Sequence, residues 1–177
     1  MFRAGNSLPT FNSNAIETSF HCIPGLTENF VYFNDDHLIG KPLEKNFFFH
    51  VDGNPRMFHR KHINKYQRAN HAMLSKNKIA FAPVAPAHQA TPVRKSDFEK
   101  VWRLFPRSLA QTQRSRFREV DNIWTIGLIF QLCDMGWFGR TSCLHEHPKP
   151  EDQMLIFLST SARAAITKQI QSYCEGH

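Results

Sequence analysis

The aromatic run Phe30-Val31-Tyr32-Phe33 passes directly into the polar triplet Asn34-Asp35-Asp36. Such a run is typical of a short buried strand, because aromatic and β-branched side chains favour the packed surface of a sheet. The two acids therefore follow the carboxyl end of a strand, where ligands gather in open α/β sheets. We predict an α/β fold whose chemistry lies at this strand end.

The remaining chain alternates apolar runs with turn residues. The pattern predicts a short helix over 15–21 and a second buried strand over 47–51. Helical apolar periods predict further helices over 61–75, 96–105, 120–133 and 153–173. The prolines between residues 79 and 92 predict an extended loop around His88.

The bulk composition limits the domain count and the class of protein. A chain of 177 residues that is 41% hydrophobic holds one ordinary core, so we expect one domain. No apolar run reaches the roughly 20 residues of a membrane-spanning helix. The four cysteines form no Cys-x-x-Cys pair, and we expect buried thiols in place of a zinc site.

The formal net charge of +7 predicts affinity for anions without naming one. No zinc finger, RNP-like strand or helix-turn-helix pattern accompanies the charge, so we expect no nucleic-acid partner. The chain has no glycine-rich phosphate loop of the GxGxxG or GxxxxGK type, which argues against a Rossmann dehydrogenase and a P-loop NTPase. Arg114, Arg116 and Arg118 either bind phosphate through their guanidinium groups or form a solvated face.

Two candidate chemistries remain open from the residues alone. Asp35 and Asp36 offer the oxygen ligands that Mg²⁺ prefers, but the residues by themselves favour an Asx turn that closes the strand. His88 is a candidate general base, because imidazole titrates near neutral pH. With ten histidines in the chain, any single one is more often solvated or hydrogen-bonded than catalytic.

Several sequence elements, taken in order, carry a resemblance to a known family. They are Leu8-Pro9-Thr10-Phe11-Asn12-Ser13-Asn14-Ala15-Ile16-Glu17, Ile23-Pro24-Gly25-Leu26, Phe30 to Asp36 and Gly40-Lys41-Pro42. Their order and spacing closely resemble the second conserved region of the Stealth proteins. The stretch from Ala87-His88-Gln89 to Arg116-Phe117-Arg118 resembles the third region, so the likeness covers residues 8–130.

The Stealth family includes capsular polysaccharide phosphotransferases and the N-acetylglucosamine-1-phosphotransferase of animals. The resemblance implies an enzyme that transfers a hexose-1-phosphate from a nucleotide sugar to a sugar hydroxyl, forming a phosphodiester in capsular or exopolysaccharide synthesis. Its partners would be a nucleotide-sugar donor and a saccharide acceptor, and its cofactor Mg²⁺ or Mn²⁺. We expect a cytoplasmic enzyme, with peripheral association at the inner face of the membrane as a further expectation.

The resemblance also implies a role for individual residues. Asp35 and Asp36 would hold the metal, while Asp36, His88 and Arg56 would act in catalysis, with His88 as the base. Arg60 is the alternative to Arg56. The substrate-binding positions would be Glu17, His21, Asn34, Asn70 and Arg118.

The chain also departs from the family pattern. The first conserved region has no counterpart before Met1, Cys22 replaces a usual arginine and Asn122 stands in the place of a common aspartate. We expect one incomplete domain over 1–177 with a Rossmann-like core of short strands and several amphipathic helices. Its parts would be region two over 8–60, region three over 61–130, and a degenerate fourth region with a terminal helix over 131–177. The alternative function is a non-catalytic fragment or pseudoenzyme that acts as a binding module.

Overall fold

The computed structural model describes residues 7–34, 37–39, 42–60, 65–81, 84–87, 89–139, 144–146 and 155–157. Its helices are α1 (Ser13–Glu17), α2 (Lys45–Phe48), α3 (Arg68–Lys76), α4 (Lys95–Leu104), α5 (Pro106–Arg114) and α6 (Thr125–Asp134), with 3₁₀ turns η1 (Phe20–Cys22) and η2 (Lys65–Gln67). Its strands are β1 (Asn29–Tyr32), β2 (His37–Ile39), β3 (Met57–Arg60), β4 (Ala85–Pro86), β5 (Thr91–Arg94), β6 (Leu144–Glu146) and β7 (Leu155–Phe157).

The described strands form three small sheets. β1 pairs antiparallel with β5, and β2 pairs antiparallel with β7. In the third sheet β3 lies between β4, which runs antiparallel to it, and β6, which runs parallel. Helices and short strands are therefore mixed along the chain, which agrees with the predicted α/β class.

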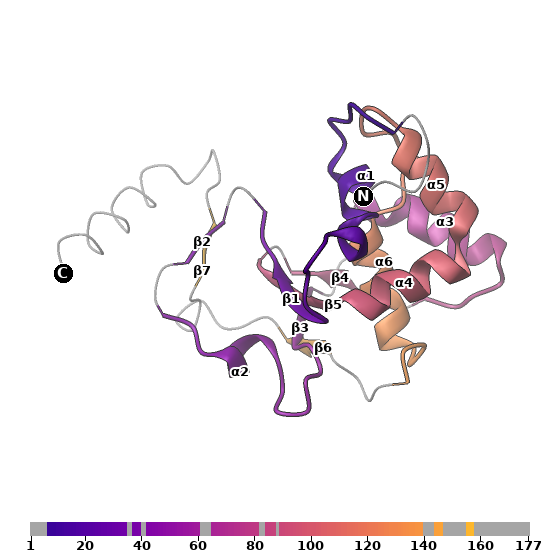
Figure 1. Cartoon of the computed structure of the whole chain (residues 1–177). Coiled ribbons are helices and arrows are strands. Elements are labelled where there is room, and N and C mark those ends of the chain that lie inside the picture. The colour runs from indigo at the N-terminus through magenta and orange to yellow at the C-terminus, as the bar shows by residue number, and fades with distance from the viewer. Residues whose placement is uncertain are drawn as a thin grey trace.

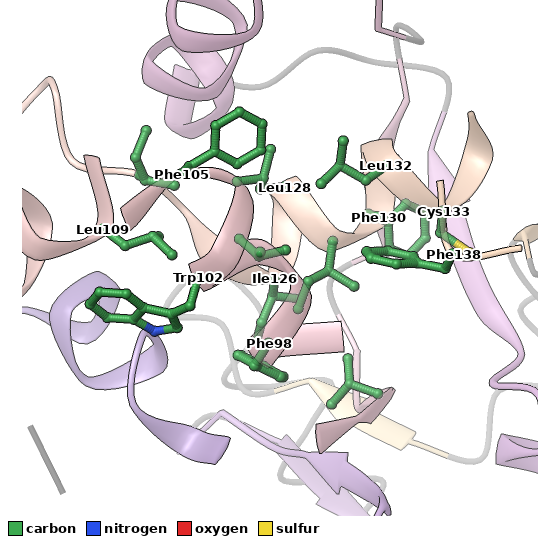
Figure 2. Close-up of a cluster of buried hydrophobic side chains, with 14 of the residues drawn as sticks. Phe98, Trp102, Phe105, Leu109, Ile126, Leu128, Phe130, Leu132, Cys133 and Phe138 are labelled. Atoms are coloured by element: carbon green, nitrogen blue, oxygen red, sulfur yellow. The ribbon is translucent and has the colours of Figure 1, made fainter. Parts of the chain in front are cut away.

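Helix α6 is the centre of the core. Every residue from Thr125 to Cys133 is buried, as expected for a helix that is apolar on all sides. Figure 2 shows Phe98 and Trp102 of α4 and Leu109 of α5 beside Ile126 of α6, in one contiguous apolar cluster. In Figure 1 the helices α1, α3, α4, α5 and α6 gather on one side, with β1, β5 and β4 at their edge.

Several sequence-based predictions of single elements are confirmed. The strand predicted at Phe30 to Phe33 is β1, and the helices predicted over 96–105 and 120–133 are α4 and α6 with shifted ends. The predicted 61–75 helix is confirmed as α3 from Arg68 onward. Pro106, which lies just after α4, begins a further helix, α5, because proline at the first helical position needs no amide partner.

Other predictions are wrong. The 47–51 strand is instead a single helical turn, α2, whose rings pack on neighbours: Phe47 lies 5.6 Å from Phe58 between ring centroids. A short apolar run fits either structure, so its period could not decide. Within 79–92 the short strands β4 and β5 interrupt the expected extended loop, and β7 replaces part of the helix predicted over 153–173.

The cysteines also differ from expectation in one case. Cys22 is a free thiol as predicted, although it is only half-buried, whereas Cys133 is disulfide-bonded. Within the described parts of the chain, no helix has both the length and the apolar character needed to cross a membrane.

Candidate functional site

Strand β1 leads directly to the predicted acids. It ends at Tyr32, and the half-buried Asn34 is the last described residue before them. Asp35, Asp36 and His88 lie outside the described residues, so their predicted roles stay predictions.

Glu17 is a buried acid on α1, next to β1. Only 4% of its surface is exposed, and the Tyr32 hydroxyl donates a hydrogen bond to Oε1 at 3.3 Å. The other oxygen, Oε2, is buried and has no hydrogen-bond partner. Burial raises the pKa of the Glu17 carboxyl to about 8, although the Tyr32 hydroxyl, the Arg118 charge and the Ile126 amide all oppose this rise. Glu17 is therefore mainly protonated and uncharged at neutral pH.

Arg118 reaches the same face of α1 from a loop far along the chain. Its guanidinium donates to the hydroxyl of Ser13, which lies one helical turn before Glu17. The guanidinium also lies over the Tyr66 ring, 5.4 Å from the centroid, and the residue is exposed. The structure thus brings together Glu17 and Arg118, two of the predicted substrate-binding residues. Among the residues that the structure describes, no acid forms an ion pair with Arg118, so the exposed guanidinium beside the neutral Glu17 suits a phosphate.

His21 lies in the aromatic core. It is 5% exposed, its ring stacks on Phe98 with centroids 6.5 Å apart, and it lies 6.2 Å from the Trp102 ring. Its Nε2 is 3.3 Å from the sulfur of Cys22. These contacts fix the turn after α1, and a substrate contact for His21 stays a prediction.

Asn70 is fully buried on α3 and joins α3 to α6. Its Nδ2 donates to the carbonyl of Trp124 at 2.9 Å, and its Oδ1 accepts from the amide of Trp124 at 3.0 Å. Because both ends of the amide are engaged by backbone, the contacts of Asn70 are structural. Substrate binding by Asn70 stays a prediction.

Arg56 lies directly before strand β3. Its Nη1 donates to the carbonyl of Asn46 at 3.0 Å, while its Nε is buried without a hydrogen-bond partner. The side chain of Arg60, the alternative arginine, lies outside the described residues. Which of Arg56 and Arg60 acts in catalysis therefore stays open.

Two residues at the site were not predicted from sequence. Tyr32 was seen only as part of a strand, although alternation along β1 places it on the same face as Phe30. Both rings contact Phe20, with centroids 5.2 Å and 6.4 Å away, and this face is turned toward α1 and η1. Ser13 was named only as part of the family-like motif, and no local pattern reveals its contact with Arg118.

The described residues hold no group of three or more His, Cys, Asp and Glu side chains that could bind a metal ion. Glu17 is a poor ligand at neutral pH, because a metal-binding carboxylate must be deprotonated. A divalent cation would depend on Asp35 and Asp36.

Comparison with known proteins places this site in a family. Residues 1–57 match the model of Stealth protein conserved region 2. A capsular polysaccharide phosphotransferase of Haemophilus influenzae is 34% identical over 133 residues, 66% of this chain and 36% of that protein. One of Aeromonas hydrophila is 36% identical over 129 residues, with the same two shares. An exopolysaccharide phosphotransferase of Mycobacterium tuberculosis is 33% identical over 135 residues, 69% of this chain and 25% of that protein.

The chain spans about a third of the length of the first two of these relatives, and a quarter of the third. The matched region contains Glu17 and the Asn34-Asp35-Asp36 triplet that follows β1. The order of these motifs, the match to conserved region 2 and the similarity to the phosphotransferases agree, and the chain belongs to the Stealth family.

Proposed function

We propose that this chain is part of an enzyme that transfers a hexose-1-phosphate from a nucleotide sugar to a sugar hydroxyl. The product is a phosphodiester of a capsular polysaccharide or exopolysaccharide. The observation that carries the proposal is the neighbourhood of Glu17 and Arg118, next to the strand that leads to Asp35 and Asp36. The phosphotransferase names of the relatives support the same reaction class.

Arg118 has the role of binding the phosphate that is transferred. A phosphate needs a cation that is not already paired, and the neutral Glu17 leaves the Arg118 charge uncompensated at pH 7. Deprotonated Glu17 would offset that charge. The high pKa of Glu17 therefore favours phosphate binding below about pH 8.

His88 would act as the base. It takes the proton from the acceptor hydroxyl, whose oxygen then forms a bond to the phosphorus that carries the sugar. The bond from that phosphorus to the bridging oxygen breaks, and the nucleoside monophosphate leaves with the bonding electron pair. Catalysis would come mainly from positioning and electrostatics. Mg²⁺ or Mn²⁺ bound by Asp35 and Asp36 would supply neutralisation of the diphosphate charge.

Pyrophosphate binding tests the role of Arg118 without turnover. We expect Arg118→Gln to weaken pyrophosphate binding in calorimetry, with Arg103→Gln on the exposed face of α4 as the matched control. We also expect the affinity of the wild type, relative to Glu17→Gln, to fall as the pH rises above 8. Equal affinity in the Arg118→Gln and Arg103→Gln variants would refute the assignment.

Turnover tests the base. Transfer from a nucleotide sugar to a saccharide acceptor should fall strongly in His88→Ala and stay unchanged in His50→Ala, whose side chain is exposed. If the folded chain binds pyrophosphate but neither binds nor turns over a nucleotide sugar with Mg²⁺, the alternative of a non-catalytic binding module of this family is correct. The replacements at Cys22 and Asn122 are the sequence features that favour this alternative.

We place the enzyme in the cytoplasm, at the inner face of the membrane, where nucleotide sugars are available. We also propose that the small sheets described above belong to a Rossmann-like core. The disulfide at Cys133 provides a test of location, because disulfides are rare in the reducing cytosol. Because Cys133 is buried, the lysate is denatured in urea with iodoacetamide present; a cytoplasmic protein should then have Cys133 alkylated, and protection until a reductant is added would argue for an oxidising compartment.

A further inference from the structure

The two groups of the candidate site come from distant parts of the chain. Ser13 and Glu17 lie on α1, and Arg118 lies in the loop 115–122, 105 residues after Ser13. A flexible arginine on an exposed loop would lose this position unless the loop itself were fixed.

We propose that Asn12 and Asn122, called here the asparagine pair, are positioning residues that hold the Arg118 loop against helix α1 at the phosphate-binding site. The inference deepens the proposed function, because it concerns how the same site is assembled. Neither residue needs to touch a substrate.

Asn12 contacts both segments at once. Its Oδ1 accepts from the amide of Asn14 at 3.1 Å and so caps α1. Its Nδ2 lies 3.2 Å from the carbonyl oxygens of Ser115 and Phe117, and 2.5 Å from Oδ1 of Asn122. The side chain has no exposed surface. One buried amide therefore orients the helix that carries Glu17 and binds the residue just before Arg118.

Asn122 fixes the other side of Arg118. Its Oδ1 also accepts from the amide of Glu119 at 3.0 Å, and its Nδ2 donates to the hydroxyl of Ser115 at 3.0 Å. It is 2% exposed. Phe117 and Glu119, the neighbours of Arg118, are each bonded through their backbone to this pair, so the backbone of Arg118 cannot shift independently.

Backbone contacts between the same segments support this arrangement. The amide of Phe11 donates to the carbonyl of Arg116 at 2.8 Å, and the rings of Phe11 and Phe117 stack with centroids 5.7 Å apart. Phe11 and Phe117 are nevertheless 66% and 61% exposed. Because this contact lies mostly in solvent, the buried hydrogen bonds of the asparagine pair are the more rigid part of the junction.

A purely structural role predicts something different. Capping of α1 requires only the acceptor of residue 12, which serine also supplies. The donors to Ser115, Phe117 and Asn122 add nothing to the cap. Asn12→Ser therefore separates the two functions, since it keeps the cap and removes the contacts to the Arg118 loop.

The titration of Glu17 reports the position of Arg118 without any substrate. The groups that face Glu17 are Tyr32 from β1, Arg118 from the loop and the amide of Ile126 on α6. Arg118 favours the ionised carboxylate, so its release moves the Glu17 titration to higher pH. This shift can be followed in the ¹³C resonance of the Glu17 carboxyl.

We expect Asn12→Ser to shift the Glu17 titration to higher pH by the same amount as Arg118→Gln. The Asn12→Ser/Arg118→Gln double variant should show no further shift, because both changes remove one interaction. Asn77→Ser, which removes an amide contact to the Met73 carbonyl on α3, is the control and should leave the titration unchanged. If Asn12→Ser unfolds the chain, Asn122→Ser tests the pair from the loop side, since it removes the amide that contacts Asn12, Ser115 and the Glu119 backbone.

A folded Asn12→Ser or Asn122→Ser variant with the wild-type Glu17 titration would overturn the proposal. So would a double variant whose shift is the sum of the single ones. Since no substrate is used, the proposal can fail while the transferase function stands. If the titration shifts as expected and pyrophosphate binding does not weaken, the positioning is correct and the phosphate role of Arg118 is wrong.

Discussion

Glu17→Gln should stabilise the fold at neutral pH. The change replaces a carboxyl by a neutral amide of the same shape, so the acceptor for the Tyr32 hydroxyl is kept. What it removes is the need to take up a proton on folding. The physical reason lies in the burial that raises the pKa of Glu17 from its ordinary value of 4.5 to about 8.

The magnitude and its sign follow from proton linkage. Between pH 4.5 and 8 the folded chain holds a proton on Glu17 that the unfolded chain has released, so the free energy of unfolding falls as the pH rises. Each pH unit in this window lowers it by about 1.4 kcal/mol. At pH 7, which is about 2.5 units above 4.5, the cost is about 3 kcal/mol, and below pH 4 it is absent.

Urea unfolding of the wild type and of Glu17→Gln at half-unit steps from pH 4 to 9 measures this cost. The difference between their free energies of unfolding should be smallest near pH 4, grow steadily toward pH 8 and then level off. All other titrating groups cancel in the difference. A difference that is constant across the range would mean that Glu17 is ionised in the folded protein at neutral pH. The assignment of a neutral Glu17 carboxyl beside Arg118 would then be wrong.

Three further predictions concern the packing around the site. Glu28→Gln should have the opposite pH dependence. Partial burial tends to raise the pKa of Glu28, but hydrogen bonds from Ser96 and Arg94 outweigh burial and lower that pKa. In urea unfolding the variant should therefore have a smaller free energy of unfolding than the wild type near pH 7, and the difference should vanish as the pH falls through the lowered pKa. Asn70→Ala should cost about 2 kcal/mol in urea unfolding, because it leaves the Trp124 amide without its acceptor, whereas the Trp124 carbonyl still accepts from the Leu128 amide; a cost near zero would contradict the contacts described. Gly127→Ala should lower the midpoint of thermal unfolding, although helix propensity alone predicts a gain of about 1 kcal/mol, because a Cβ would lie 2.5 Å from the Trp124 ring.

The sequence was sufficient to predict elements with a long, regular period. Helix α4 could be predicted because Phe98, Val101 and Trp102 recur at helical spacing, and all three are buried. The Phe47-Phe48-Phe49 run could not be assigned, since an apolar run without period fits a strand or a helical turn. In that case the contacts of Phe47 with Phe58 favoured the turn, and such contacts depend on the tertiary structure.

The sequence named residues of the candidate site but not the contacts among them. Glu17 and Arg118 were named through the family resemblance, but neither spacing nor charge shows that Arg118 contacts the face of α1 that carries Glu17. Tyr32 was missed for the same reason, since a strand pattern gives the face of a residue and not its partner. A raised pKa could not be predicted at all, because it follows from burial, which a single sequence does not specify for an acid.

Buried side-chain amides determine how the distant segments of this fold meet. Asn12 joins α1 to the Arg118 loop, Asn70 joins α3 to the start of α6, and Gln113 of α5 donates to the hydroxyl of Ser19 at 2.6 Å. Apolar packing brings such segments together but tolerates small shifts, whereas a hydrogen bond to a backbone group requires a defined direction. A site that binds phosphate through one arginine depends on that direction more than on the total buried area. At Asn70 the direction is defined twice, because both ends of its amide bond the backbone of Trp124 at the start of α6.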